Sequence, residues 1–423
     1  MVGIIEAAGW AIVGGSAAQA ATGLYGAIQR RLRESATAAR DARLFEQRAR
    51  LLLQSDRADR ERSELSWNGN RKFYIDRKVE EAKDICSFYL KPHDDKPLAP
   101  FLPGQYLTFQ LKIPGQAKPL VRCYSLSDTP TNLDHYRVTI KRLDPPPKKP
   151  DAPPGLSSNY FHRELKEGAI LDVRAPAGHF HLDQTAEKPV VLIGGGVGLT
   201  PVWSMLNTIC ALGSRRETWF FYGVTNRTDH AMYERMKEIR RDHDNVRIVV
   251  CYSRPTESCT QGSDYDHQGF VSVELFRKLL PSNNYEFYIC GPPPMMQAVT
   301  NDLKEWGVPD GDVHFEAFGP ATIKRTSPAK PAQDAAASDG IEVVFARSDK
   351  ILTWKPERGS LLDFAEENGI SIDYGCRAGN CGTCVTAVKE GEVTYLSEPG
   401  AEPDKGSCLT CIAVPRSRLV LDG

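Results

Sequence analysis

Between residues 67 and 183, the chain alternates apolar and polar residues in short runs. The clearest runs are Lys72–Val79, Ser87–Leu90, Tyr106–Leu111, Tyr136–Arg142 and Ala169–Arg174. Alternation with a period of two is typical of strands that bury one face, and turn residues such as Pro103-Gly104 separate the runs. We therefore predict an antiparallel β-barrel over residues 67–183.

Residues 184–321 have a different pattern, in which wholly apolar runs alternate with helical stretches. The apolar runs are Val190–Ile193, Thr218–Tyr222, Arg247–Tyr252 and Glu286–Cys290, and stretches such as Thr200–Leu212 and Asp229–Arg241 lie between them. Strands that are apolar on both faces are typical of a parallel sheet covered by helices. This part of the chain is predicted to be an α/β domain with a parallel sheet.

The first 66 residues are predicted to be helical and contain two unlike segments. Residues 1–29 carry a single charge, Glu6, and are long enough to span a bilayer. The basic run Arg30–Arg33 would keep its end of the segment in the cytoplasm. An Ala-rich helix that packs on a partner explains the same residues, and both interpretations stay open. Residues 30–66, rich in arginine and acidic residues, are predicted to form a charged helical stalk.

Charge balance, linker composition and cysteine content indicate which partners and sites the chain is expected to have. The 53 basic and 54 acidic residues leave a formal net charge of −1, which gives no reason to expect nucleic acid as a partner. Residues 322–340 are rich in Pro, Ala, Ser and Lys, so they predict a linker to a final domain at 341–423. The chain has 11 cysteines, an odd number that does not suggest a disulfide framework. Their concentration near the C-terminus indicates a metal site.

The cysteine-rich segment has the spacing C-x4-C-x2-C at Cys376, Cys381 and Cys384, and Cys411 follows later. Three thiolates on one tight loop can wrap an iron–sulfur cluster, and a distant fourth thiolate closes the site. Glycines at 375, 379 and 382 let backbone N–H groups approach the cluster sulfurs. The alternative is zinc, held by the pairs Cys381–Cys384 and Cys408–Cys411, but this interpretation leaves Cys376 unused.

Residues 341–423 resemble plant-type [2Fe–2S] ferredoxin domains over their whole length. The resemblance implies an α+β domain of the β-grasp type that exchanges one electron at a low potential. It also implies that the cluster ligands are Cys376, Cys381, Cys384 and Cys411 and that Cys408 is a spectator.

A second motif, Arg122-Cys-Tyr124-Ser125, lies in the predicted barrel. A flavin diphosphate needs a guanidinium for its phosphates, an aromatic face beside the isoalloxazine ring and a small hydroxyl near the reactive nitrogen. The run R-x-Y-S supplies all three. Tyr106 lies upstream, and Gly155-Leu-Ser-Ser158-Asn159 downstream opens a predicted helix whose start can cradle a diphosphate.

A glycine-rich loop, Gly194-Gly195-Gly196-Val-Gly198-Leu-Thr200-Pro201, follows the first apolar strand and opens a helix. Glycines let the backbone approach a pyrophosphate, and a helix N-terminus favours its negative charge. Tight strand–helix packing explains the glycines equally well. Two later segments extend the pattern, Cys290-Gly291-Pro292 at the end of a strand and Glu316-Ala-Phe318 at the end of the domain.

Together these motifs resemble the ferredoxin-NADP reductase superfamily, and residues 70–320 resemble the reductase half of flavohaemoglobins in particular. The resemblance implies FAD rather than FMN. It assigns Arg122 and Ser158 to the diphosphate, and Tyr124 and Ser125 to the flavin ring.

The same resemblance puts Cys290 at the hydride-transfer point, Phe318 against the flavin and Glu316 near the nicotinamide pocket. The predicted catalytic residues are therefore Ser125, Cys290 and Glu316. The remaining predicted cofactor-binding residues are Tyr106, Gly155, Asn159, Gly194, Gly195, Gly196, Gly198, Thr200, Pro201, Gly291 and Pro292.

This order of domains predicts an electron-transfer oxidoreductase. A reduced nicotinamide gives a hydride, FAD converts it to single electrons, and the cluster carries one electron at a time. Because the globin of flavohaemoglobins is replaced by a helical segment, the expected acceptor is a separate oxygenase, desaturase or haem protein. Two alternatives remain, a membrane-bound redox subunit that reduces quinone and a non-catalytic scaffold with structural zinc. NADH and NADPH both stay open, because Arg227 and Arg254 suit a 2′-phosphate or a solvated surface.

Overall fold

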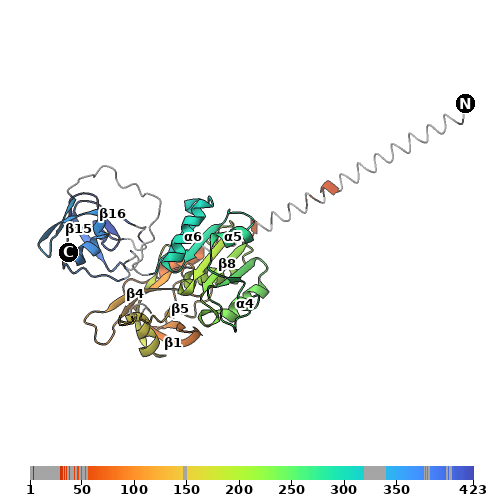
Figure 1. Ribbon diagram of the computed structural model, residues 1–423, viewed down its shortest axis with the longest axis horizontal. Coiled ribbons are helices and arrows are strands. Elements are labelled where there is room, and N and C mark those ends of the chain that lie inside the picture. Colours follow the sequence, from red (N-terminus) through yellow and green to blue (C-terminus); the bar gives the residue numbers. More distant parts are fainter. Residues whose placement is uncertain are drawn as a thin grey trace. The chain divides into compact units, whose positions relative to one another are not determined.

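The computed structural model describes residues 56–145, 150–318, 340–375, 377, 379, 382–396, 399 and 403–423, with scattered positions among the first 53. The chain divides into two compact units, residues 1–60 and residues 61–423. The second unit contains every named strand (Figure 1). The linker predicted at 322–340 lies outside the described residues except for Gly340.

The N-terminal segment is helical wherever it is described, and residues 56–65 form an unbroken helical stretch. Of the candidate membrane segment 1–29, only Gly3 and Gln29 are described, so that prediction lies outside the described residues. Among the helices that the structure does describe, none combines the length and apolar character needed to cross a membrane.

The first sheet of the second unit contains six antiparallel strands. They are β1 (Arg71–Ala82), β2 (Ile85–Pro92), β3 (Tyr106–Leu111), β4 (Leu120–Ser125), β5 (Tyr136–Lys141) and β6 (Ile170–Ala177), in the order β4-β3-β6-β1-β2-β5. An antiparallel bridge between Leu126 and Val138 joins the end of β4 to β5, so the two edge strands meet. The helical turn α2 (Leu156–Asn159) and a π-helical turn (Tyr160–Glu164) follow, and Phe161 inserts into the barrel core.

The second sheet is parallel throughout, as predicted. Its strands are β7 (Val190–Gly195), β8 (Thr218–Val224), β9 (Val246–Tyr252), β10 (His267–Gln268), β11 (Glu286–Cys290) and β12 (Val313–Glu316), in the order β10-β9-β8-β7-β11-β12. The helices are α3 (Leu199–Ala211), α4 (Tyr233–Asp242), α5 (Val273–Leu279) and α6 (Pro293–Glu305). Alternate residues of β7 point into two separate cores, one shared with α3 and α4 and the other with α5 and α6. Burial on both faces explains why these strands are wholly apolar.

One predicted boundary in this domain differs from the structure by more than two residues. The stretch Asp229–Arg241 was expected to be helical, but α4 begins only at Tyr233. Residues Arg227–Asp229 form a separate 3-10 turn, because the Asn226 side chain accepts a hydrogen bond from the Thr228 N–H and caps that turn.

The C-terminal domain has a mixed sheet packed on one helix. Its elements are β13 (Ile341–Phe345), β14 (Lys350–Trp354), α7 (Leu361–Glu367), β15 (Val385–Glu390), β16 (Val393–Tyr395), β17 (Ser407–Leu409), β18 (Ala413–Pro415) and β19 (Leu419–Leu421). The main sheet has the order β14-β13-β19-β15-β17, with β13 and β19 parallel. A Ser360–Asp363 capping box starts α7, which buries Leu361 and Phe364 in the core. This arrangement agrees with the predicted β-grasp class.

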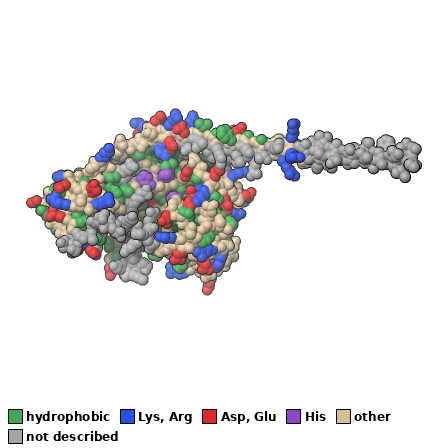
Figure 2. Space-filling view, turned by 90° about the horizontal axis from the view of Figure 1, so that it is seen from above, with side chains coloured by type: hydrophobic (Ala, Val, Ile, Leu, Met, Phe, Trp, Pro, Cys, Tyr) green, Lys and Arg blue, Asp and Glu red, His purple; other side chains and the backbone are tan. Residues whose placement is uncertain are grey.

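Acidic and basic side chains are interspersed over the face drawn in Figure 2. In that view a cluster of Lys and Arg side chains also stands out on the N-terminal helix.

Candidate functional site

Strand β4 holds the aromatic residue of the R-x-Y-S motif in a defined orientation. The Tyr124 ring meets Phe109 and Phe161 edge-on, at centroid distances of 5.8 Å and 5.3 Å. Its hydroxyl lies 2.8 Å from the Ser157 Oγ at the start of α2. Burial raises the pKa of Tyr124 to about 12, so the phenol stays neutral at physiological pH. The ring is therefore held by packing on its edges and by a polar contact at its tip.

Tyr106 and Ser125 are paired across the β3–β4 ladder, and both are buried. The close approach of Tyr106 to the β6 end requires a glycine, since a Cβ at Gly178 would lie 2.6 Å from the Tyr106 Cε1. Gly178 also has a φ of +118°, which L side chains rarely adopt. The structure thus brings together two of the predicted flavin-site residues.

The predicted diphosphate cradle at Gly155 is a tightly bonded turn. Ser158 Oγ accepts the Leu143 N–H at 3.1 Å and donates to the Gly155 carbonyl at 3.1 Å. Asn159 Nδ2 donates to the Leu143 carbonyl at 2.9 Å. These side chains hold the turn against the segment that follows β5. Their role toward a diphosphate stays a prediction.

The glycine-rich loop lies at the carboxyl end of β7 and interlocks with the end of β11. A Cβ at Gly198 would lie 2.5 Å from the Cys290 carbonyl oxygen, and one at Gly291 would lie 3.1 Å from the Gly195 Cα. Gly196 has a φ of +54°, and no described atom lies within 4 Å of the position that a Cβ would occupy there, so its backbone faces open space. A bare backbone at the start of the 13-residue helix α3 fits a bound pyrophosphate.

The carboxyl ends of β11 and β12 bring Cys290 and Glu316 side by side. The two residues are directly paired in the β11–β12 register. Glu316 Oε2 is buried and has no hydrogen-bond partner among the described residues. Burial raises the pKa of Glu316 to about 8, and burial, with a smaller contribution from Glu316, raises the pKa of the Cys290 thiol. A buried acceptor without a partner fits a site that is completed by a ligand.

The other predicted nicotinamide and flavin residues are placed on the same edge of the sheet. Thr200 and Pro201 lie in the first turn of α3, where the Thr200 Oγ1 donates to the Val197 carbonyl at 3.2 Å. Pro292 is the N-cap of α6. Phe318, the last described residue before position 340, is 40% exposed, which leaves its ring available to a flavin.

Two of the four predicted cluster ligands are described, and the structure brings them together. The Sγ atoms of Cys384 and Cys411 lie 3.1 Å apart, and the Gly379 N–H donates to the Cys411 Sγ at 3.3 Å. Two neighbouring cysteine sulfurs, one of which accepts a backbone N–H, fit the ligands of an iron–sulfur cluster. Cys376 and Cys381 lie outside the described residues. Cys408 is buried in the domain core, as Cys384 and Cys411 are, and its spectator role stays a prediction.

The segment before Cys376 contacts the barrel at two points. Arg122 Nη1 donates to the Gly375 carbonyl at 3.2 Å and to the Val121 carbonyl at 2.7 Å. Lys118 and Asp373 form an ion pair of 2.7 Å. The barrel therefore contacts the segment from Asp373 to Gly375, directly before Cys376, within the unit formed by residues 61–423.

Comparison with known families agrees with this order of sites. The chain matches an oxidoreductase FAD-binding domain over residues 72–182, an oxidoreductase NAD-binding domain over 192–301 and a 2Fe-2S iron-sulfur cluster binding domain over 345–416. A flavohemoprotein from Halalkalibacterium halodurans is 42% identical over 255 residues, which cover 60% of this chain and 61% of that protein. One from Bacillus cereus is 41% identical over 259 residues, covering 61% and 63%. The chain spans less than two thirds of the length of these relatives.

Solved structures show the same relationship. The flavohem-like FAD/NAD binding domain of nitric oxide dioxygenase from Vibrio cholerae is 30% identical, with a TM-score of 0.52 and coverage of 60% of this chain and 100% of that domain. The chain belongs to the ferredoxin-NADP reductase superfamily. A phthalate dioxygenase reductase, described as modular for electron transfer from pyridine nucleotides to [2Fe-2S], is 26% identical with a TM-score of 0.52. It covers 84% of this chain, and the match spans 98% of that reductase.

The predicted cofactors of this reductase are confirmed as FAD, a nicotinamide dinucleotide and a [2Fe–2S] cluster. The zinc alternative is set aside, because residues 345–416 match a family that binds a 2Fe-2S cluster. The individual residue roles stay predictions, since the family matches do not assign them.

The residues that suit a 2′-phosphate lie together at the carboxyl ends of β8 and β9. The Arg254 N–H donates to the Thr225 carbonyl at 2.9 Å, which brings the two loops together. Arg227 stacks on the Tyr233 ring, with its guanidinium carbon 3.5 Å from the centroid. This contact is compatible with a 2′-phosphate beside Arg227 and also with a solvated arginine. Both NADH and NADPH therefore stay open as donors.

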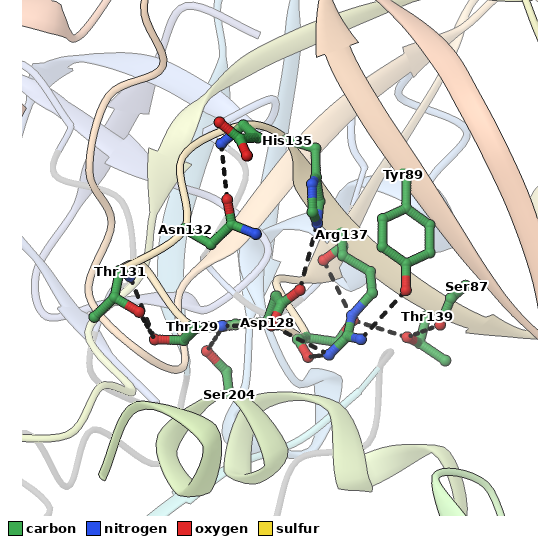
Figure 3. A network of polar contacts seen from close by, with 12 residues as sticks. Ser87, Tyr89, Asp128, Thr129, Thr131, Asn132, His135, Arg137, Thr139 and Ser204 are labelled. Carbon is green, nitrogen blue, oxygen red and sulfur yellow. Dashed lines mark hydrogen bonds and ion pairs between the residues drawn. The ribbon is translucent and has the colours of Figure 1, made fainter. Parts of the chain in front are cut away.

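One group of polar residues beside the flavin strand was not predicted from the sequence. Asp128, His135 and Arg137 form a network that also reaches Ser204 of α3 (Figure 3). The signal available in the sequence was weak, because only the position of Asp128 three residues after Ser125 points to it.

Proposed function

We propose that this reductase takes electrons from NADH or NADPH and delivers them, one at a time, to a separate protein acceptor. The bound groups would supply hydride transfer to the flavin and one-electron transfer through the cluster. The observation that carries the proposal is the contact between the flavin-motif Arg122 and the Gly375 carbonyl, because it puts the residue directly before Cys376 beside the R-x-Y-S strand.

Each site residue has a proposed task. Arg122 would bind the FAD diphosphate through its guanidinium, and Tyr124 and Ser125 would position the flavin ring. Cys290, beside Glu316, would fill the space under the nicotinamide, and its buried neutral thiol excludes water there. Cys376, Cys381, Cys384 and Cys411 would hold the cluster.

The proposed acceptor is an oxygenase, a desaturase or a haem protein. Support comes from the phthalate dioxygenase reductase, which transfers electrons from pyridine nucleotides to [2Fe-2S] and is matched over 98% of its length. The matched flavohemoproteins carry additional length beyond the shared module, so their complete activity is not transferred to this chain.

An anaerobic titration of the purified chain tests the proposal. Addition of NADH, and separately NADPH, should bleach the flavin absorbance and then the cluster absorbance, and the more effective donor identifies the preference. Reduction of cytochrome c should require the cluster, whereas reduction of ferricyanide should require only FAD. A flavin that does not respond to either nucleotide would overturn the proposal.

We further propose that residues 1–29 attach the reductase to the cytoplasmic face of a membrane or to a partner helix. The proposal rests on the low charge and length of this segment. Fractionation of cells that express the full chain and a variant lacking residues 1–29 tests it. Recovery of both in the same soluble fraction would contradict a membrane anchor.

A further inference from the structure

The chain that leaves the flavin strand is tied to β5 at its first two residues. The antiparallel bridge between Leu126 and Val138 closes the barrel. The Ser127 N–H then donates to the Arg137 carbonyl at 2.9 Å, and the Arg137 guanidinium donates back to the Ser127 carbonyl. Ser127 Oγ also lies 2.8 Å from the Thr139 Oγ1 inside the barrel. The segment that directly follows Ser125 is therefore held in place.

Asp128, the next residue, is anchored by its side chain. Its carboxylate lies 3.4 Å from the His135 Nε2 and 3.5 Å from the Arg137 Nη2, and it accepts the Thr129 N–H at 2.9 Å. Burial alone would raise the pKa of Asp128, but the hydrogen bond from His135 and the charge of Arg137 hold it below its ordinary value. The carboxylate is thus ionised, and three polar contacts hold the Asp128 side chain in place.

The backbone carbonyl of Asp128 accepts a hydrogen bond from the nicotinamide domain. Ser204, fully buried in α3, donates its Oγ proton to this carbonyl at 2.6 Å (Figure 3). Helix α3 begins at Leu199, immediately after the glycine loop that ends at Gly198. The bond therefore joins a point three residues past Ser125 to a point six residues past Gly198.

We propose that the Ser204–Asp128 hydrogen bond is a positioning contact that sets the separation between the flavin strand and the nicotinamide loop. Ile85, Phe180 and Leu182 of the barrel side share an apolar core with α3. Apolar packing is non-directional, whereas a short hydrogen bond fixes both distance and angle. Because a misplacement of about 1 Å can cost about 100-fold in rate, one directional contact at this seam affects hydride transfer.

The inference rests on the proposed function and is tested with the FAD-loaded full chain. Ser204→Ala removes the interdomain donor and keeps a good helix former. Thr208→Ala is the matched control, since the Thr208 Oγ1, equally buried one turn later, donates only to the Ser204 carbonyl of its own helix, at 2.7 Å. Both variants lose one buried hydroxyl from α3, but only the first loses the bond to the barrel.

Two readouts separate positioning from stability. Stopped-flow reduction of the flavin by saturating NADH or NADPH should slow by about tenfold or more in Ser204→Ala, with the Kd of the nucleotide unchanged and Thr208→Ala close to wild type. Hydrogen exchange should rise in residues 126–130 and at the start of α3 in Ser204→Ala only. Ser204→Cys, whose thiol is slightly larger than the hydroxyl and a weaker donor, should give an intermediate rate if Ser204→Ala does not fold.

The outcomes distinguish this inference from the proposed function. If the wild-type flavin is not reduced by either nucleotide, the proposed function fails. If the wild type is reduced and Ser204→Ala matches Thr208→Ala in both rate and hydrogen exchange, the positioning role is overturned while the function stands.

Discussion

A methyl group at Gly198 should separate the two loops that form the nicotinamide site. The backbone of Gly198 has a φ of −63° and a ψ of −4°, which alanine adopts without strain. The added Cβ would lie 2.5 Å from the Cys290 carbonyl oxygen and 2.6 Å from the Gly291 Cα. To reach an ordinary contact of 3.4 Å, the loops must move apart by about 0.9 Å. Gly198→Ala should therefore act through a steric clash, and this clash displaces the loops of the nicotinamide site itself.

The expected magnitude follows from that displacement. Overpacking of this kind destabilises a domain by about 1–3 kcal/mol. The melting temperature should then fall by roughly 2–12 °C. A shift of nearly 1 Å at the reacting centre should lower the rate of flavin reduction by about 100-fold.

Gly311→Ala is the matched control for this variant. No described atom lies within 4 Å of the position that its Cβ would occupy, and its φ is not in the left-handed region. Differential scanning calorimetry and stopped-flow reduction by NADH and NADPH should show Gly311→Ala close to wild type. If Gly198→Ala also keeps the wild-type melting temperature and rate, the close approach of the two loops does not restrict position 198 to glycine.

Three further predictions concern the cluster, the buried carboxyl group and the contact between the cluster loop and the barrel. Cys411→Ser should lose iron and the visible cluster absorbance while it keeps FAD, whereas Cys408→Ser should keep both, as measured by iron content and spectra. Because burial raises the pKa of Glu316 to about 8 from 4.5, its contribution to stability is complete below pH 4.5 and is lost as the pH rises through 8. Glu316→Gln should remove that loss, so the difference in melting temperature between variant and wild type should grow from pH 5 to pH 9; a constant difference would argue against the shifted pKa. Lys118→Glu should slow cluster reduction at low salt by no more than about fivefold, since the pair with Asp373 is 74% and 70% exposed, and the double charge swap with Asp373→Lys should restore it. Equal rates in the single and double variants would contradict a role for this pair.

Local patterns in the chain were enough to predict most of the strands in the first two sheets and the cofactor that each domain binds. The predicted runs Tyr106–Leu111 and Glu286–Cys290 coincide with β3 and β11. These predictions succeeded because side-chain periodicity reports directly which faces are buried. The start of α4 was placed four residues early, because the cap that Asn226 supplies to a separate turn competes with helix continuation.

Contacts between distant segments could not be predicted in this way. The pairing of Cys290 with Glu316 depends on β12 joining β11 in one register, and the bond from Ser204 to Asp128 depends on how α3 meets the closed barrel. Domain order, strand pattern and the cysteine and glycine motifs depend on neighbours along the chain, so they could be predicted from local patterns. Which motifs touch became clear only from the folded protein, because register and domain packing result from the shapes of many buried side chains acting together.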